Sequence, residues 1–257
     1  MKSILLVGLL TISTHVYAQG SIPAGTVLPV RLESSLSQKT VPGQVIKARV
    51  MQDIPLADGS KIRAGAMVMG QVVAVTPATN GTNPTISFKF DRLVISRRTV
   101  PITTGLRALA STLEIDDAQL PSTGPDRGTP PAAYTTVQVG GNEVVYRGGG
   151  HVMNGLELVG EPVPNGVLVG IRPNLARGCR GQVRDNEPPQ ALWVFASNAC
   201  GVYGYPDVKI LNSGREVPIG QITLGAERGD FNIRGGSGML LRIIGDNMTG
   251  AQASRRS

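Results

Sequence analysis

The sequence predicts an all-β protein built of two β-rich parts, and three observations support this prediction. Short runs of β-branched residues recur along the chain, and turn signals such as Pro42-Gly43, Asp58-Gly59 and Asn80-Gly81 separate them. Residues 111–136 carry four prolines together with Gly, Ser and Thr, a composition that cannot bury a core. We therefore expect a linker over 111–136 with a separate β domain on each side.

The first element in chain order is an export signal. Lys2 supplies a positive charge, Ile4–Leu10 is an apolar run too short to span a bilayer, and small residues precede a cleavage point between Ala18 and Gln19. Residues 1–18 are therefore predicted to be a signal peptide, and the mature protein is predicted to be periplasmic or secreted. No later stretch approaches the ~18 apolar residues of a membrane helix, so none is expected after signal removal.

Five strands are expected before the linker. They cover Thr26–Leu32, Gln44–Val50, Met67–Val75, Thr85–Phe90 and Leu93–Ile95. The fourth run alternates clearly, which places Ile86, Phe88 and Phe90 on a packed face and its polar residues on a solvent face. The spacing of apolar residues over 106–113 predicts one short helix.

A short pattern, I-x-A-G followed by a small residue, occurs at Ile22–Thr26 and again at Ile62–Ala66. Glycine at the same place in each copy predicts two similar turns that lead into neighbouring strands, and the expected role is architectural. Together with the segments Val41–Val45 (VPGQV) and Met69-Gly70, these turns resemble the β-barrel domain of the TrbI-like channel proteins of conjugation and type IV secretion. The resemblance covers about residues 22–102. It implies a small N-terminal β-barrel over 19–110, in a stand-alone exported module, and brings no catalytic residue.

Seven strands are expected toward the C-terminus, within a second β domain over 137–247. They cover Thr136–Val139, Glu143–Arg147, Val167–Ile171, Ala191–Ala196, Asp207–Leu211, Gln221–Leu224 and Met239–Ile244. Ser213-Gly214 predicts a hairpin from Val208 to Ile219. Its return strand, Arg215–Ile219, contains a proline, which cannot donate to a ladder, so the proline is expected in an edge strand or at the start of a strand. Residues 248–257 are expected to form a flexible tail.

Cys179 and Cys200 are the only cysteines, and an oxidising destination favours a disulfide between them over a redox or metal pair. Loop-closure entropy gives such a bond a stabilisation of about 3 kcal/mol. We therefore expect a disulfide within the second domain.

The mature chain is poor in the side chains that most enzymes use. It keeps one histidine, His151, which follows three glycines and is interpreted as part of an exposed turn. The closest groups of acids are Glu157 with Glu161, and Glu114 with Asp116 and Asp117; neighbouring acids are usually only solvated. The sequence therefore favours a non-catalytic binding or structural module of the bacterial cell envelope, without cofactor or metal. The alternative is a secreted, glycosidase-like hydrolase that uses two carboxylates.

The densest aromatic group brackets Cys200 and consists of Trp193, Phe195, Tyr203 and Tyr205. An exposed group would form a sugar- or peptide-binding surface, whereas packing against the disulfide is the favoured interpretation. The candidate ligand-site residues at this point are His151, Trp193, Tyr203 and Tyr205.

The net positive charge of the chain indicates which classes of partner it could bind. The formal charge of +7 becomes +6 when Lys2 leaves with the signal, because 7 − 1 = 6. Such a protein suits an envelope protein or an anionic cell-wall polymer as partner. The pairs Arg97-Arg98 and Arg255-Arg256 have no interleaved aromatic residues, so nucleic acid is not favoured.

Overall fold

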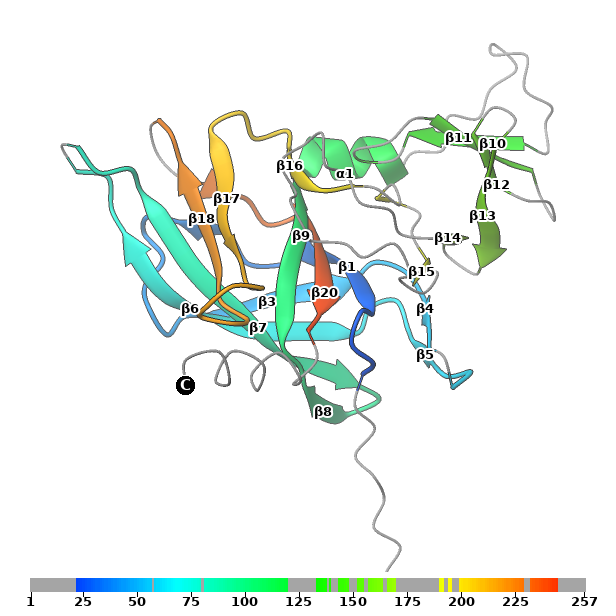
Figure 1. The fold of residues 1–257 in the computed structure, drawn as a ribbon, viewed down its shortest axis with the longest axis horizontal. Coiled ribbons are helices and arrows are strands. Elements are labelled where there is room, and N and C mark those ends of the chain that lie inside the picture. The colour runs from blue at the N-terminus through cyan, green and yellow to red at the C-terminus, as the bar shows by residue number, and fades with distance from the viewer. Residues whose placement is uncertain are drawn as a thin grey trace, which may run out of the picture.

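The computed structural model describes residues 22–119 except 57 and 80, then 133–137, 139, 143–147, 152–154, 157–163, 166–169, 190–191, 194–195, 199–228 and 232–244. The predicted signal peptide with its Ala18-Gln19 cleavage point and the predicted tail over 248–257 lie outside these residues. Strands dominate the described residues, with a single eight-residue helix among them, so the all-β class is confirmed (Figure 1). In this part of the chain no helix is long and apolar enough to cross a membrane.

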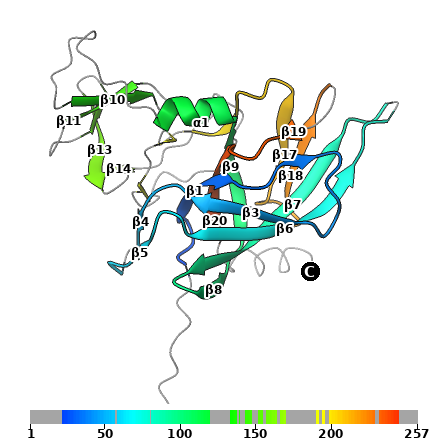
Figure 2. The same ribbon diagram turned by 180° about the vertical axis from the view of Figure 1, so that it is seen from behind.

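A ten-stranded sheet forms the body of the protein (Figures 1 and 2). Its strands are β1 (Val27–Leu32), β3 (Val45–Val50), β6 (Met67–Thr76), β7 (Thr85–Ile95), β8 (Arg98–Pro101), β9 (Thr104–Ala110), β16 (Gly201–Tyr203), β17 (Val208–Ser213), β18 (Ile222–Ala226) and β20 (Gly238–Ile243). The order is β16-β9-β20-β1-β3-β6-β7-β18-β17, and β8 pairs with β7 off this path. The β16–β9 pair is parallel, and the other pairs are antiparallel.

The expected division into separate domains over 19–110 and 137–247 is corrected by the sheet order. Strands β16, β18 and β20 follow the predicted linker, yet they pair with β9, β7 and β1 of the first part, and β17 joins the same sheet through β18. The physical reason is that β1 is buried on both faces and needs a partner at each edge: β3 supplies one and β20 the other. The buried Arg107 of β9 also donates from Nε to the carbonyl oxygen of Ala199 at 2.9 Å.

The sheet is strongly curved but does not close into the barrel that the family resemblance implies. Its ends, β16 and β17, are consecutive in the chain, and the end of β17 packs against the start of β9. A Cβ added to Gly105 would lie 2.9 Å from the carbonyl oxygen of Ser213. No ladder joins β17 to β9 within the described residues, so this contact is a packed seam rather than a strand pair.

Smaller elements surround this sheet. The short pairs are β2 (Leu36–Ser37) with β19 (Asn232–Ile233), and β4 (Ile54–Pro55) with β5 (Lys61–Ile62). A six-stranded sheet follows the order of the chain: β10 (Ala133–Val137), β11 (Glu143–Arg147), β12 (Val152–Asn154), β13 (Glu157–Val163), β14 (Gly166–Val169) and β15 (Gln190–Ala191). This second sheet lies at the side of the molecule that carries the helix (Figures 1 and 2).

Two groups of buried side chains lie on opposite faces of the curved sheet. The larger group fills its concave side and includes the three residues of the alternating run, Ile86, Phe88 and Phe90, each at most 1% exposed. That prediction is therefore confirmed for the packed face. The smaller group lies under helix α1 (Thr112–Gln119), where Ile115 packs with Leu240 of β20.

The helix predicted over 106–113 is wrong in its position. Residues 104–110 form β9, and every one of them is buried. A central strand that packs on both faces has no polar–apolar alternation, so its leucines and alanines also fit a helical stripe. The helix begins only at Thr112, where the hydroxyl of Ser111 accepts from the N–H of Glu114 at 3.4 Å.

The glycine turns have the predicted architectural role. Gly25, Gly43 and Gly65 all have φ between +83° and +89°, a backbone shape that other residues adopt only with strain. Each is the third residue of a turn closed by a backbone hydrogen bond of 3.1–3.2 Å, and each turn precedes a strand: β1, β3 or β6. The two I-x-A-G copies lead into β1 and β6, which are not adjacent but flank the same strand, β3.

Candidate functional site

Two irregularities in the β6–β7 ladder create the candidate site. Gly70 pairs with Phe90 while Met69 pairs with Arg92, so Asp91 is an extra residue on β7. Val72 pairs with Phe88 while Ala74 pairs with Ser87, so Val73 is an extra residue on β6. Such bulges redirect side chains and often border functional sites.

On the edge of β7 that faces away from β6, the partner strand changes next to the two bulges. Strand β18 pairs with Thr85–Phe88, and β8 pairs with Arg92–Ile95. Between them, Lys89–Asp91 has no strand partner on this side. The connection from β8 to β9 passes there instead: the N–H of Ile102 donates to Asp91 O at 3.0 Å, and the hydroxyl of Thr104 donates to Phe90 O at 3.0 Å.

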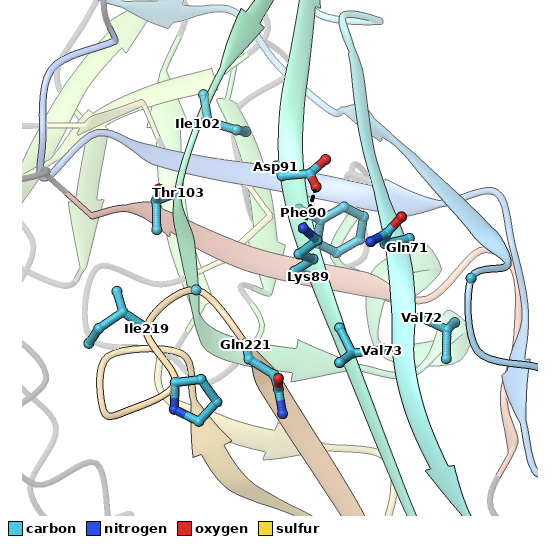
Figure 3. Close-up of a pocket in the computed structure, with 13 residues that line it drawn as sticks. Gln71, Val72, Val73, Lys89, Phe90, Asp91, Ile102, Thr103, Ile219 and Gln221 are labelled. Atoms are coloured by element: carbon cyan, nitrogen blue, oxygen red, sulfur yellow. Dashed lines mark ion pairs between the residues drawn. The ribbon is translucent and has the colours of Figure 1, made fainter. Parts of the chain in front are cut away.

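A pocket of about 520 Å³ opens where the ladder is interrupted (Figure 3). Both bulged residues line it. The full lining is Gly43, Gln71, Val72, Val73, Lys89, Phe90, Asp91, Ile102, Thr103, Pro218, Ile219, Gly220 and Gln221. Figure 3 shows Gln71 and Lys89 on the side of β6 and β7, with Ile219 and Gln221 across the pocket from them. The lining thus combines two amides, a hydroxyl and an ion pair with aliphatic surface.

The wall opposite β6 and β7 comes from the chain between β17 and β18. The sequence predicts a return strand over 215–219, but the structure starts that strand only at Ile222. Pro218 lacks the N–H that a ladder needs, and the backbone instead turns so that Gly220 donates to Gly214 O at 2.7 Å. Residues 214–221 therefore form a loop that lines the pocket. The pocket therefore combines residues that precede the predicted linker with residues that follow it.

The charges in the pocket are already paired. The Lys89 ammonium lies 3.0 Å from one carboxylate oxygen of Asp91, and Arg92 Nε donates to the other at 3.0 Å. Asp91 is the only acid in the lining. Both carboxylate oxygens of Asp91 are thus occupied by ion pairs, so the pocket presents a ligand with a paired charge rather than a free carboxylate.

Gly70 is the residue that permits this geometry. A Cβ at this position would lie 1.8 Å from the carbonyl oxygen of Lys89 and 2.8 Å from the Cα of Phe90. Both are backbone atoms of a paired strand, so they cannot move aside cheaply. The backbone of β7 approaches β6 this closely only because position 70 has no side chain.

Of the four sequence-predicted ligand residues, the structure describes Tyr203 and Tyr205, and neither lies in the pocket lining. His151 and Trp193 lie outside the described residues. The hydroxyl of Tyr203 bonds both backbone polar groups of Cys200 at 3.0 Å, and the hydroxyl of Tyr205 pairs with that of Ser237 at 2.5 Å. Tyr203 is buried and Tyr205 packs against the main core, so both tyrosines have structural contacts.

Cys200 is fully buried and is not a free cysteine. Its predicted partner, Cys179, lies outside the described residues, so the pairing stays a prediction. The phenol of Tyr203 holds the Cys200 backbone, and Phe195 is fully buried nearby in the sequence.

Of the two groups of candidate acids, the structure describes the side chains of only one, the group on α1. Glu157 and Glu161 lie on β13, and their side chains are outside the described part. Asp116 on α1 forms an ion pair of 2.6 Å with Arg31. Within the described residues, no three His, Cys, Asp or Glu side chains are grouped so that they could hold a metal ion.

Three acids outside the pocket have pKa values below their ordinary range. Lys61 and then the N–H of Ala64 lower the pKa of Asp53, Ser60 lowers the pKa of Asp58, and Lys209 lowers the pKa of Glu227. A general acid near neutral pH needs the opposite shift. These groups therefore act as ion-pair and turn-forming residues.

Sequence reasoning did not single out Gln71, Lys89 or Gln221. The available signal was Gly70, a lone glycine within a strand pattern, which indicates a bulge or a close backbone approach. A scan against protein-family models finds no match to this chain, and a search of curated proteins finds none either. The likeness to TrbI-like proteins therefore depends on the turn motifs alone.

Proposed function

We propose that this chain is an exported, non-catalytic binding module of the bacterial cell envelope and that the β6–β7 pocket is its ligand site. The supporting observation is that both bulged residues and the 214–221 loop converge on one pocket whose only acid is neutralised. Its volume is within the range of small-ligand sites, roughly 300–1,000 Å³. The lining suits a ligand, or a segment of an envelope protein, with both aliphatic surface and hydrogen-bonding groups.

Export to the periplasm or beyond forms part of this proposal and is supported by the N-terminal signal pattern. It predicts that the protein from a fractionated cell starts at Gln19 and carries a disulfide between Cys179 and Cys200. Mass spectrometry of the intact protein, before and after reduction, measures both features. We also propose, from the turn motifs alone, that the chain is related to the TrbI-like β-barrel domain.

The ligand is sought by affinity capture of the tagged mature protein from envelope extract, with washes at rising salt. The matched variants are Val73→Trp, which fills the pocket from an exposed bulge, and Leu211→Trp, which places the same ring at an exposed position outside the lining. We expect wild type and Leu211→Trp to retain a partner in high salt and Val73→Trp to lose it. An identical captured set with both variants would reject the pocket as the site.

The hydrolase alternative is tested by the same preparation. A panel of glycosides incubated with the mature protein should show no turnover that depends on Glu157 or Glu161. Turnover that disappears in Glu157→Gln or Glu161→Gln would overturn the non-catalytic proposal.

A further inference from the structure

A second surface of the sheet, which shares only Gln71 and Lys89 with the pocket lining, has the chemistry of an interaction site. It is the convex side of β3, β6 and β7, which lie next to one another in the sheet (Figure 2). Residues that alternate with the core point to this side. Registered pairing sets them in three rows: Val45, Gln71 and Lys89; Lys47, Met69 and Arg92; Arg49, Met67 and Val94. We call these nine residues the convex face.

The convex face is positively charged. Its four cations are Lys47, Arg49, Lys89 and Arg92. Asp91 neutralises one charge between Lys89 and Arg92, and Glu33 forms an ion pair with Arg49. Four cations against two acids leave two positive charges in excess. Lys47, in the middle row of the face, is exposed and has no ion pair with another described residue.

Apolar side chains lie between these cations. Met69 sits in register between Lys47 and Arg92, and Met67 sits beside Arg49. Both methionines are partly exposed, and Val45 at the edge is 47% exposed. The face therefore presents a stripe of polarisable, apolar groups bordered by positive charges.

We infer that the convex face binds the surface of an anionic phospholipid bilayer. Lysine and arginine side chains are attracted to lipid phosphates, and an apolar stripe gains by burial at the boundary between headgroups and acyl chains. An acidic polysaccharide would use the cations but gain little from Met67 and Met69. Nucleic acid would need aromatic stacking partners, which this face lacks. The inference rests on the proposed export, which brings the protein to a membrane surface, but does not depend on the pocket.

The test measures partitioning of the mature protein onto vesicles of phosphatidylcholine, with and without phosphatidylglycerol, by co-sedimentation. Lys47→Gln and Lys47→Glu change the charge of the middle row of the face by one and two units. Arg228→Gln is the control, because it removes one charge from a side chain that is 87% exposed and lies after the end of β18, away from the convex face. Met69→Gln tests the apolar stripe at unchanged charge.

Wild type should bind only the vesicles that contain phosphatidylglycerol, and binding should fall steeply with salt. Lys47→Gln should weaken partitioning by about fivefold and Lys47→Glu by about 25-fold, since each basic residue near an anionic surface contributes roughly 1 kcal/mol. Arg228→Gln should stay within about twofold of wild type by the same estimate. Met69→Gln should bind more weakly even at low salt.

Equal losses in Lys47→Gln and Arg228→Gln would overturn the inference, because net charge alone would then explain binding. Absence of binding at low salt, or binding to an acidic polysaccharide but not to vesicles, would overturn it as well. Partner capture from envelope extract tests the pocket separately from the convex face. The captured partner should be lost in Val73→Trp and retained in Lys47→Gln. If the proposal for one of the two sites is rejected, the proposal for the other can still be tested.

Discussion

Substituting Gly70 by alanine is the sharpest perturbation of the candidate site. The new Cβ would lie 1.8 Å from Lys89 O, 2.7 Å from Lys89 C and 2.8 Å from the Cα of Phe90. All three contacts are to backbone, so relief requires β6 and β7 to separate at the bulge. Overpacking at a rigid place costs about 1–3 kcal/mol, and a clash with paired backbone belongs at the upper end. We expect Gly70→Ala to lower the free energy of unfolding by about 3 kcal/mol.

Thermal unfolding followed by circular dichroism measures this loss. For a chain of this size, about 3 kcal/mol corresponds to a fall in Tm of roughly 6–12 °C. Gly65→Ala is the control, because Gly65 has φ +83° but no atom within 4 Å of its added Cβ. It should cost only the strain of a left-handed backbone, about 1–2 kcal/mol. If Gly70→Ala were as stable as Gly65→Ala or more stable, the proposed close approach of β6 and β7 would be wrong.

Three further predictions concern other parts of the fold. Because Lys61 and Ala64 lower the pKa of Asp53, the stability it adds is present at neutral pH and is lost as pH falls through about 4 and below. Urea unfolding should thus show Asp53→Asn less stable than wild type at pH 7 and equal to it near pH 2; a constant difference would contradict this. Replacing Cys179 and Cys200 together by alanine should cost about 3 kcal/mol, matched by reduction of the wild type; no effect of reductant would argue against the disulfide. Ser111→Ala should cost about 1 kcal/mol by removing the helix cap, whereas Ser111→Asp should not.

The local features of the fold were predictable because they depend on few residues. Gly25 and Gly65 require positive φ, and the patterns around them identify turns without any knowledge of distant contacts. The alternation of Ile86, Phe88 and Phe90 identifies a buried strand face in the same way. These signals predicted β1, β3 and β6 with errors of one residue at their ends, whereas β7 was predicted as two strands, Thr85–Phe90 and Leu93–Ile95, that the structure joins into one.

Long-range pairing was not predictable from the same signals. Nothing in residues 222–226 or 238–243 indicates that their partners lie far away in the chain, as Ile222 pairs with Phe88 and Gly238 with Arg31. The proline-rich segment therefore predicts a domain boundary that the sheet does not have. Strand β9 was missed because burial on both faces removes its alternation. The pocket was not predictable for the same reasons. One of its walls, residues 218–221, comes from the later part of the chain and lies beside Thr103, just before β9.

The central claim is that strands from before and after the predicted linker form one sheet, together with its pocket. Its most direct test inserts a specific protease site after Pro125 and cleaves the purified protein. The two fragments should then elute together in size-exclusion chromatography and unfold in one thermal transition, because β20 remains paired with β1 and β18 with β7. Fragments that separate without denaturant and fold independently would contradict the claim.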